Sequence, residues 1–549
     1  MRRGRTICLA AVAALGVTLL AGTAQAARPA TALSYLPDDA LTAAVLDGRL
    51  DAAEAALERA RSLTDREAVR ERHGTISRPG PRDATLILRD LVARFRGLSP
   101  AGQAEASRIL ARPDDGRADP LGSGYSVPED EVVVTCSTHF CVHWVETTAD
   151  APPLLDTDAS GVSDYVEAAV QTLEEVYAYE VDASGYRAPK PDLASRNHGP
   201  DERVDVYLGD VGADGYYGYC MTDDPAAFTG TIYDVSSYCV LDDDYSLAQF
   251  GAFGSTGLDA LRVTAAHEFF HAVQAAYDFF DDLVLIEGTA TWMEDEVYDD
   301  IDDNIQYLDR SPLARPDIPF DLALRSPTNP LSGFQYGAWI FYRYLGEIVA
   351  GPELIRRIWE HADAASGARD LQSLQAVDAA LRERGSTFGG TFASFAAANT
   401  VAFDVYEEGD RYPVPAPARR ATLNAGGSVS GRVTLDHQTS WYGSFEPRPS
   451  VGASARLRFT LDLPPRLRGS QARAVVIRTS GASQFVQAKL DAKGDATLNV
   501  PFGRPAISRV VLVLTNASAR YECWRDTVLA CQGLPLDDNI VFRYTARAR

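Results

Sequence analysis

The chain has 549 residues, more than one hydrophobic core usually serves, so we expect two or more domains. An apolar fraction of 46% is normal for a globular protein and excludes disorder along the whole chain. The net charge of −24 leaves no basic surface to neutralise phosphates, which excludes nucleic acid as a partner.

Residues 1–26 have the pattern of a secretory signal peptide. Arg2 and Arg3 give a basic start, residues 7–22 are almost wholly apolar, and residues 24–26 read Ala-Gln-Ala, a typical cleavage site. An uncleaved membrane anchor is the alternative. No later stretch is long and apolar enough to span a bilayer. We therefore expect a secreted, extracellular protein with no membrane span.

The cysteines support an oxidising compartment. Seven are present, and Cys8 lies within the signal. The others could be joined in several ways, but their spacing favours bridges between neighbours. The expected disulfides are Cys136–Cys141, Cys220–Cys239 and Cys523–Cys531. A cysteine metal site is disfavoured because the C-x-x-C spacing is absent.

Residues 27–125 are rich in Ala, Leu, Arg and Glu. Apolar positions recur at helical spacing in 41–45 and 88–95. We expect a helical N-terminal segment that is either a propeptide or an N-terminal domain, and the sequence leaves both open.

Residues 126–411 combine an α/β lobe with a helical lobe. Strand-like runs at 131–135 and 142–145 flank the first cysteine pair, which predicts a hairpin tied across its end. A helix is expected from Asp164, because Val166, Val170, Leu173 and Tyr177 share one face. Further strands are expected at 204–208, 231–235 and 238–241, and helical periodicity dominates from Leu258 to about residue 403.

The last part of the chain predicts a separate β domain. Residues 412–428 begin with a Pro-rich run that reads as a stiff linker. Short strands separated by turns follow, a pattern typical of a β-sandwich over 429–549. They are expected at 429–435, 455–461, 474–479, 510–515 and 540–545.

One motif carries the chemistry. Residues 267–271 read His-Glu-Phe-Phe-His, an H-E-x-x-H motif within a run that has no helix breakers. On a helix, His267 and His271 lie roughly 40° apart around the axis, so both imidazoles can reach one zinc ion. Glu268 sits beside them, where it can act on a zinc-activated water as general base.

Zinc needs a third protein ligand and an open position. Glu287 is the candidate, on a second helix that follows a turn at 278–282. The alternative is an H-E-x-x-H motif that occurs by chance on a buried helix, but the downstream Glu makes the zinc interpretation the better one.

A family resemblance supports this interpretation. The run Glu-Gly-Thr-Ala-Thr-Trp-Met-Glu from Glu287 is similar to the Glu-Gly-Phe-Ala signature that carries the third zinc ligand of gluzincins. More closely, residues 130–345 resemble a largely uncharacterised family of secreted bacterial zinc metalloproteases, notably in 140–144, 205–208, 217–220 and 335–339. The resemblance implies a zincin-like unit over 126–411, with His267, His271 and Glu287 on zinc and Glu268 as base. The gap from His271 to Glu287 is shorter than in thermolysin-like or aminopeptidase sequences.

The expected activity is hydrolysis of extracellular proteins or peptides. Gluzincins often use a Tyr hydroxyl on the developing oxyanion, and Tyr336 is the candidate here. An edge strand beside the site should pair with extended substrate, and either 204–208 or 231–235 could serve. An aminopeptidase would need an acidic group for the substrate amine, and the sequence does not identify one.

Residues 156–167, DTDASGVSDYVE, match a calcium-binding loop. The expected ligands are Asp156, Asp158, Ser160, Val162 through its carbonyl, Asp164 and Glu167. The alternative is an ordinary turn that caps the following helix. The competing hypothesis for the whole chain is a calcium-stabilised extracellular binding protein that retains an inactive zincin fold.

Overall fold

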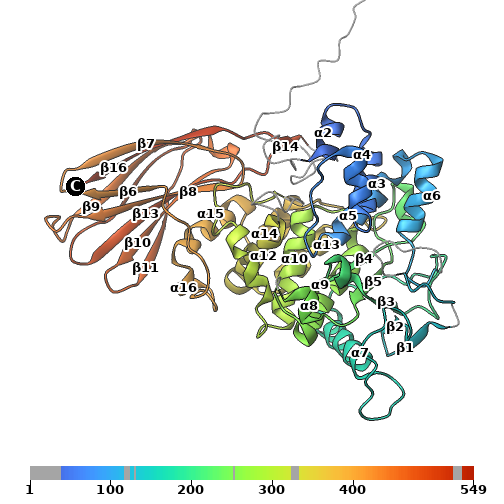
Figure 1. The fold of residues 1–549 in the computed structure, drawn as a ribbon. Helices are drawn as coiled ribbons and strands as arrows, with labels where there is room; N and C mark the ends of the chain where they lie inside the picture. The colour runs from blue at the N-terminus through green and yellow to red at the C-terminus, as the bar shows by residue number, and fades with distance from the viewer. Residues whose placement is uncertain (1–38, 116–123, 129–130, 252–253, 323–332, 523–533) are drawn as a thin grey trace, which may run out of the picture.

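The computed structural model describes residues 39–115, 124–128, 131–251, 254–322, 333–522 and 534–549. The chain is an α+β protein with an N-terminal helical segment, a mixed five-stranded sheet packed with helices, and C-terminal β-sheets (Figure 1). Residues 1–26 and the Cys523–Cys531 pair lie outside the described residues. Among the described helices, none has the length and apolar character needed to cross a membrane.

The N-terminal segment, residues 39–115, is a set of short helices. Its first three helices begin at aspartates whose side chains accept a helix N–H, namely Asp39, Asp51 and Asp65. The helices are α2 (Ala40–Leu46), α3 (Ala52–Arg61), α4 (Arg66–His73), α5 (Ala84–Arg94) and α6 (Pro100–Ile109).

The five-stranded sheet has two antiparallel edges. The strands are β1 (Val133–Cys136), β2 (Phe140–Trp144), β3 (Val204–Gly209), β4 (Gly218–Met221) and β5 (Tyr238–Asp242), in the order β1-β2-β3-β5-β4. Strands β2, β3 and β5 run parallel, whereas β1 and β4 are antiparallel to their neighbours. Cys136 faces Cys141 and Cys220 faces Cys239 across antiparallel pairs, and both disulfides are formed as predicted.

The strand predicted at 204–208 is confirmed as β3, but its predicted place at the sheet edge was wrong, and the strand predicted at 231–235 is absent. Strand β3 lies inside the sheet, between β2 and β5, so residues 204–208 cannot form its edge. Residues 231–235 form no strand, because their backbone bonds to a helix: Val235 N–H donates to Ala275, and Tyr233 accepts from Phe279 N–H. The edge on that side is β4.

The sheet is covered on both faces because its side chains alternate. Val206 and Leu208 of β3 pack into one core with α7 (Asp164–Tyr177) and α9 (Gly257–Asp278). Tyr207, between them, points the other way into a core shared with Leu88 of α5. The N-terminal segment therefore forms the second cover of the sheet.

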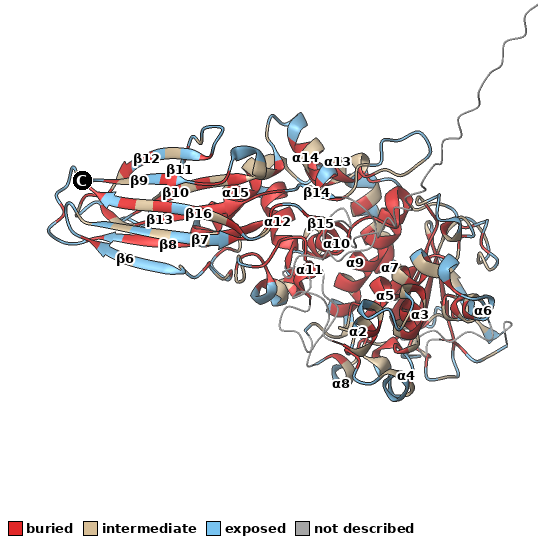
Figure 2. Cartoon of the chain, turned by 90° about the horizontal axis from the view of Figure 1, so that it is seen from above, coloured by how far each residue is buried: buried red, intermediate tan, exposed pale blue. Residues whose placement is uncertain are grey.

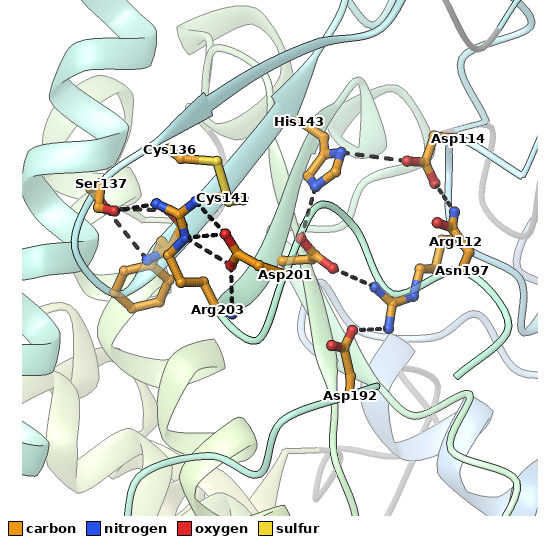
Figure 3. A network of polar contacts seen from close by, with 12 residues as sticks. Arg112, Asp114, Cys136, Ser137, Cys141, His143, Asp192, Asn197, Asp201 and Arg203 are labelled. Carbon is orange, nitrogen blue, oxygen red and sulfur yellow. Dashed lines mark hydrogen bonds and ion pairs between the residues drawn. A yellow bond between two sulfur atoms is a disulfide. The ribbon is translucent and has the colours of Figure 1, made fainter. Parts of the chain in front are cut away.

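A buried ion-pair network also anchors the N-terminal segment to the sheet. Arg112 is fully buried and bonds Asp192 (2.5 Å), Asp205 (2.6 Å) and Asp223 (3.0 Å). His143 Nε2 contacts the same Asp205 at 2.9 Å. Figure 3 shows the Arg112 guanidinium next to Asp192, with His143 and Asp114 above it.

Helices dominate the rest of the central unit, which we define as residues 131–411. They are α8 (Leu247–Phe250), α10 (Leu283–Val297), η6 (Asp303–Arg310), α11 (Phe334–Gly337), α12 (Trp339–Tyr344), α13 (Glu353–His361), α14 (Leu374–Glu383), α15 (Phe388–Ala398) and α16 (Ala402–Val405). Figure 2 shows α9 and α10 as buried helices near the middle of the molecule.

The C-terminal part consists of two sheets with one core between them. One sheet has β6 (Arg419–Leu423), β8 (Thr439–Pro447), β10 (Ser470–Arg478), β11 (Ser483–Gln487) and β13 (Ile507–Asn516). The other has β7 (Ser428–Leu435), β9 (Arg456–Asp462), β12 (Asp495–Pro501) and β16 (Ile540–Ala548). Strands β14 (Tyr521–Glu522) and β15 (Leu534–Pro535) form a separate two-stranded sheet. Phe445, Phe459 and Phe542 meet in the shared core.

The predicted linker at 412–428 is too long. Residues 419–423 form β6, which pairs in parallel with β8, so the sandwich begins about ten residues earlier than the prediction of residue 429. This strand was missed because it is an exposed edge with only Leu423 buried, and it lacks the apolar alternation that marks the other strands.

Candidate metal centre

Two helices joined by a short turn form the candidate site. Helix α9 carries His267, Glu268 and His271, and four residues separate its end from the start of α10, where a turn was predicted. Asp282 caps α10 by accepting from Val284 N–H. Helix α10 also packs tightly on α12. A Cβ added to Gly288 would lie only 2.6 Å from the Tyr342 ring. Glycine beside Glu287 therefore permits the close helix contact that holds this carboxylate in place.

The structure brings the predicted zinc ligands together. His267 Nε2 lies 3.3 Å from Glu287 Oε2, and His271 Nε2 lies 3.7 Å from Glu287 Oε1. The two imidazole rings stand at 89° to each other with centroids 4.7 Å apart. Donor atoms of His267, Glu268 and His271 all lie within 4.8 Å of one another. Glu287 is not part of that group, and it approaches the two histidines through different oxygen atoms.

The other nitrogen of each imidazole is already bonded. His267 Nδ1 lies 2.7 Å from Glu294 Oε1, and His271 Nδ1 lies 2.8 Å from Gln274 Oε1. Gln274 in turn donates to Thr289 Oγ1 at 3.1 Å. Such contacts fix the ring orientation and leave Nε2 for a metal.

Neither Glu294 nor Gln274 was predicted as a site residue. Both could have been predicted from helical spacing. Glu294 lies two turns beyond Glu287 on the same helix face, and Gln274 lies three residues after His271.

Burial sets the charge state of the site. It lowers the pKa of His271 to about 4 and the pKa of His267 well below its usual range, so both imidazoles are neutral at physiological pH. Burial also raises the pKa of Glu268 to about 7, a rise that Arg82 opposes. The pKa of Glu287 is raised well above its usual range, first by burial and then by the carboxylates of Glu268 and Asp83.

Several polar atoms at this point have no hydrogen-bond partner among the described residues. They are Nε2 of His267, both carboxylate oxygens of Glu287 and Oε1 of Glu268. Buried polar atoms are nearly always satisfied, so such a cluster needs an explanation. A divalent cation would satisfy the two ligand groups and favour an ionised Glu287.

The N-terminal segment lies directly on this centre. Thr85 of α5 contacts Glu268 Oε2 at 3.3 Å, and Asp83 accepts a hydrogen bond from the Tyr336 hydroxyl at 3.0 Å. The Tyr336 ring centroid is 6.3 Å from that of His267. The predicted oxyanion donor is therefore close to the site, but its hydroxyl is bonded to the N-terminal segment.

Little space remains at the site. A cavity of about 10 Å³ is lined by Thr85, Arg89, Cys220 and His271, room for a single water at most. A larger hollow of about 480 Å³ lies along α5 near Phe228 and Asp282, and none of the candidate zinc residues lines it.

The predicted calcium loop is held by hydrogen bonds from its own backbone to its aspartates. Asp156 accepts from the backbone N–H groups of Ser160 and Gly161, and Asp158 accepts from Ser160 N–H. Ser163, one residue before the predicted ligand Asp164, caps α7. Val162 lies between these groups and Glu167 lies in the first turn of α7. The carboxylates thus bond the loop backbone, and calcium binding here stays a prediction.

Two other groups of described residues hold carboxylates close enough to share a cation. One is Asp210, Asp242 and Asp243, and the other is Asp295, Asp302 and Glu408. Neither contains a histidine, so neither competes with the α9–α10 site for zinc.

Comparison with known proteins adds no family. No family model matches the chain, and no curated protein matches it. Among solved structures, the pre-peptidase C-terminal domain of a collagenase from Bacillus anthracis aligns with 12% identity and a TM-score of 0.15, over 24% of this chain and 98% of that chain. A family GH115 4-O-methyl-α-glucuronidase with specificity for decorated arabinogalactans aligns with 13% identity and a TM-score of 0.14, over 53% of this chain and 38% of that chain. Scores this low carry no conclusion about fold or function.

Proposed function

We propose that the protein is a secreted zinc-dependent peptidase with a zincin-like central unit. The observation that carries the proposal is that, where α9 meets α10, the imidazoles are held by hydrogen bonds on one side while the atoms that would bind zinc have no hydrogen bond. Each imidazole has Nδ1 bonded to a fixed acceptor, while Nε2 of His267 and both oxygens of Glu287 have no hydrogen bond among the described residues.

The donor set fits zinc. Two neutral imidazoles and one carboxylate are the protein ligands of a hydrolytic zinc site, which keeps one position open. His267, His271 and Glu287 would hold the ion, and Glu294 and Gln274 would orient the imidazoles. When bound, zinc supplies Lewis acidity at this point.

Two more side chains would do the work on the substrate. Glu268 has one unbonded oxygen and a pKa of about 7, so it can take up and return a proton near neutral pH. Tyr336 can donate to the oxygen that gains charge when the peptide carbonyl is attacked. For this role its hydroxyl must exchange Asp83 for the substrate.

The test compares Glu268→Gln with a matched control, Glu180→Gln, which alters a fully buried glutamate on another helix. Zinc content and hydrolysis of a quenched mixed-sequence peptide library are measured on the mature chain, before and after limited proteolysis. We expect about one zinc per chain in all three proteins. Hydrolysis should fall by about 100-fold or more in Glu268→Gln alone.

Two results would overturn the proposal. One is a wild-type chain that takes up no zinc at the α9–α10 site. The other is hydrolysis that survives both chelation and Glu268→Gln. Zinc uptake without any hydrolysis, even after limited proteolysis, would favour the binding-protein alternative.

A further inference from the structure

The candidate site is closed by part of the same chain. His267, Glu268 and Glu287 are at most 1% exposed, and His271 is 6% exposed. No peptide can reach them in this state. From outside the central unit, Thr85 hydrogen-bonds Glu268 and Asp83 accepts from the Tyr336 hydroxyl. Arg89, one helical turn further, donates to the backbone oxygens of Phe279 and Asp281 and so fastens α5 to the end of α9.

This part of the N-terminal segment also occupies the edge of the sheet. Tyr217 N–H, just before β4, donates to the Pro81 carbonyl at 3.0 Å, and Cys220 N–H within β4 donates to Thr85 Oγ1 at 3.1 Å. An open sheet edge beside an active site pairs with an extended substrate through such main-chain donors. Residues 81–85 therefore use donors that a substrate backbone would need.

Arg82 fills an acidic pocket next to the site. Its guanidinium is 3.2 Å from Glu294 Oε1 and 3.2 Å from Asp303 Oδ2, and its Nε donates to the Tyr307 hydroxyl at 2.9 Å. It also lies over the Tyr217 ring, 5.3 Å from the centroid. Arg82, Glu294 and Asp303 have side chains no more than 2% exposed. Glu294 joins the pocket to the site, because the same carboxylate bonds His267.

The pocket favours a cation in place of Arg82. Loss of Arg82 would leave Glu294 and Asp303 as two neighbouring buried carboxylates with no positive charge between them, although Glu294 still contacts His267 and Asp303 still accepts from Gln306 and from Ser255 N–H. A guanidinium suits the pocket better than an ammonium, because it is planar, donates several hydrogen bonds at once and stacks on an aromatic ring.

We propose that residues 81–89 are an autoinhibitory cover of the candidate site, and that the Arg82 pocket receives an arginine side chain of the peptide substrate once the cover is displaced. This inference rests on the proposed peptidase function.

The cover is best tested in the full mature chain. Leu57, Leu88 and Leu91 of the N-terminal segment share an apolar core with Tyr207 and Tyr219 of the sheet, so deletion of the segment would expose that face. Arg82→Ala weakens only the contacts at the site. Arg49→Ala, which removes an exposed arginine of the same segment, is the matched control.

Access is measured first, without reference to activity. The metal-free proteins are treated with diethyl pyrocarbonate, and modification of His271 is followed by peptide mass spectrometry. We expect His271 to react about tenfold faster or more in Arg82→Ala than in the wild type and Arg49→Ala. If Arg82→Ala does not fold, Asp83→Ala replaces it. Equal rates in all folded variants would overturn the cover.

The pocket is then tested by rescue and by cleavage. Ethylguanidinium should raise the Tm of Arg82→Ala, should do little for the wild type, and should lose its effect when Asp303→Asn is added. In the zinc-loaded Arg82→Ala chain, peptides with Arg should be cleaved about tenfold faster or more than the same peptides with norleucine. Absence of rescue together with equal cleavage of both peptides would overturn the pocket. Rescue and fast His271 modification without any cleavage would contradict the peptidase function alone.

Discussion

The central unit is flanked by two neighbours that attach to it in different ways. The N-terminal segment inserts arginines: Arg82 reaches Glu294 and Asp303 beside the candidate site, and Arg112 reaches three aspartates of the sheet region. The C-terminal sandwich attaches by an apolar contact together with a buried ion pair between His437 and Asp321. Its strands β10 and β13 pack against α15 and the residues that follow this helix. The valines and isoleucine at this contact are Val475, Ile477, Val511 and Val513, and they meet Ala396, Ala397 and Val401.

The difference teaches that the two contacts respond differently to change. Apolar packing loses stability in proportion to the area removed and is indifferent to the state of the site. Loss of one partner of a buried ion pair lowers the free energy of unfolding sharply, because the other charge stays buried without compensation. The N-terminal contact is therefore linked to the chemistry of the site, whereas the sandwich contact serves as a scaffold.

The largest expected effect is that of Glu294→Ala, the residue that joins site and cover. Its loss removes the acceptor of His267 Nδ1 and leaves Arg82 with Asp303 as its remaining buried acidic partner. We expect the free energy of unfolding to fall by about 3–5 kcal/mol. Zinc affinity should weaken by about 10- to 100-fold. Denaturant unfolding and competitive zinc titration measure the two effects. An unchanged zinc affinity would show that Glu294 holds the cover without orienting His267.

Arg112→Ala should cost almost as much stability without reaching the site. It leaves Asp192 and Asp205 buried without their cation, at a cost of about 3–4 kcal/mol in denaturant unfolding. Arg203→Ala, whose partner Asp201 is partly exposed, is the control and should cost much less stability than Arg112→Ala. Similar values for both variants would show that burial does not decide the strength of this contact.

His437 gives the sandwich one charged contact with the central unit, and its effect should depend on pH. It lies between Asp321 and Asp538, which raise its pKa to about 10 against the opposing effect of burial. Because the folded-state pKa is raised, the stabilisation is complete below about pH 6.5 and is lost as pH rises toward 10.

His437→Asn should therefore lower stability by about 2–3 kcal/mol at pH 6 and by much less at pH 10. Thermal unfolding at the two pH values measures this difference. A loss of the same size at both values would mean that the imidazole acts by packing and not by charge.

The smallest expected effect is that of Val513→Ala at the apolar contact. It removes two buried methyl groups next to α15 and should cost about 1–2 kcal/mol. Zinc uptake and the rate of His271 modification should stay at wild-type values. A change in either would mean that the sandwich also controls access to the site.

Much of the site could be predicted from local patterns. The H-E-x-x-H spacing places His267 and His271 on one side of a helix whatever surrounds it, and the short gap to Glu287 leaves room for one turn between two helices. The two observed disulfides also follow from sequence neighbours. These features depend on contacts only a few residues apart, which the backbone geometry of helices and hairpins fixes.

The sequence by itself therefore determined the ligand helix, its partner helix and the general order of helices and strands. Only the tertiary structure decided that β4, and neither β3 nor residues 231–235, is the sheet edge on that side. It also decided that Thr85 reaches Glu268 and that Arg82 meets Glu294, contacts that join residues about two hundred positions apart. Periodicity reports which face of an element is buried, but the identity of the element that covers it is set by long-range packing, which no local pattern records.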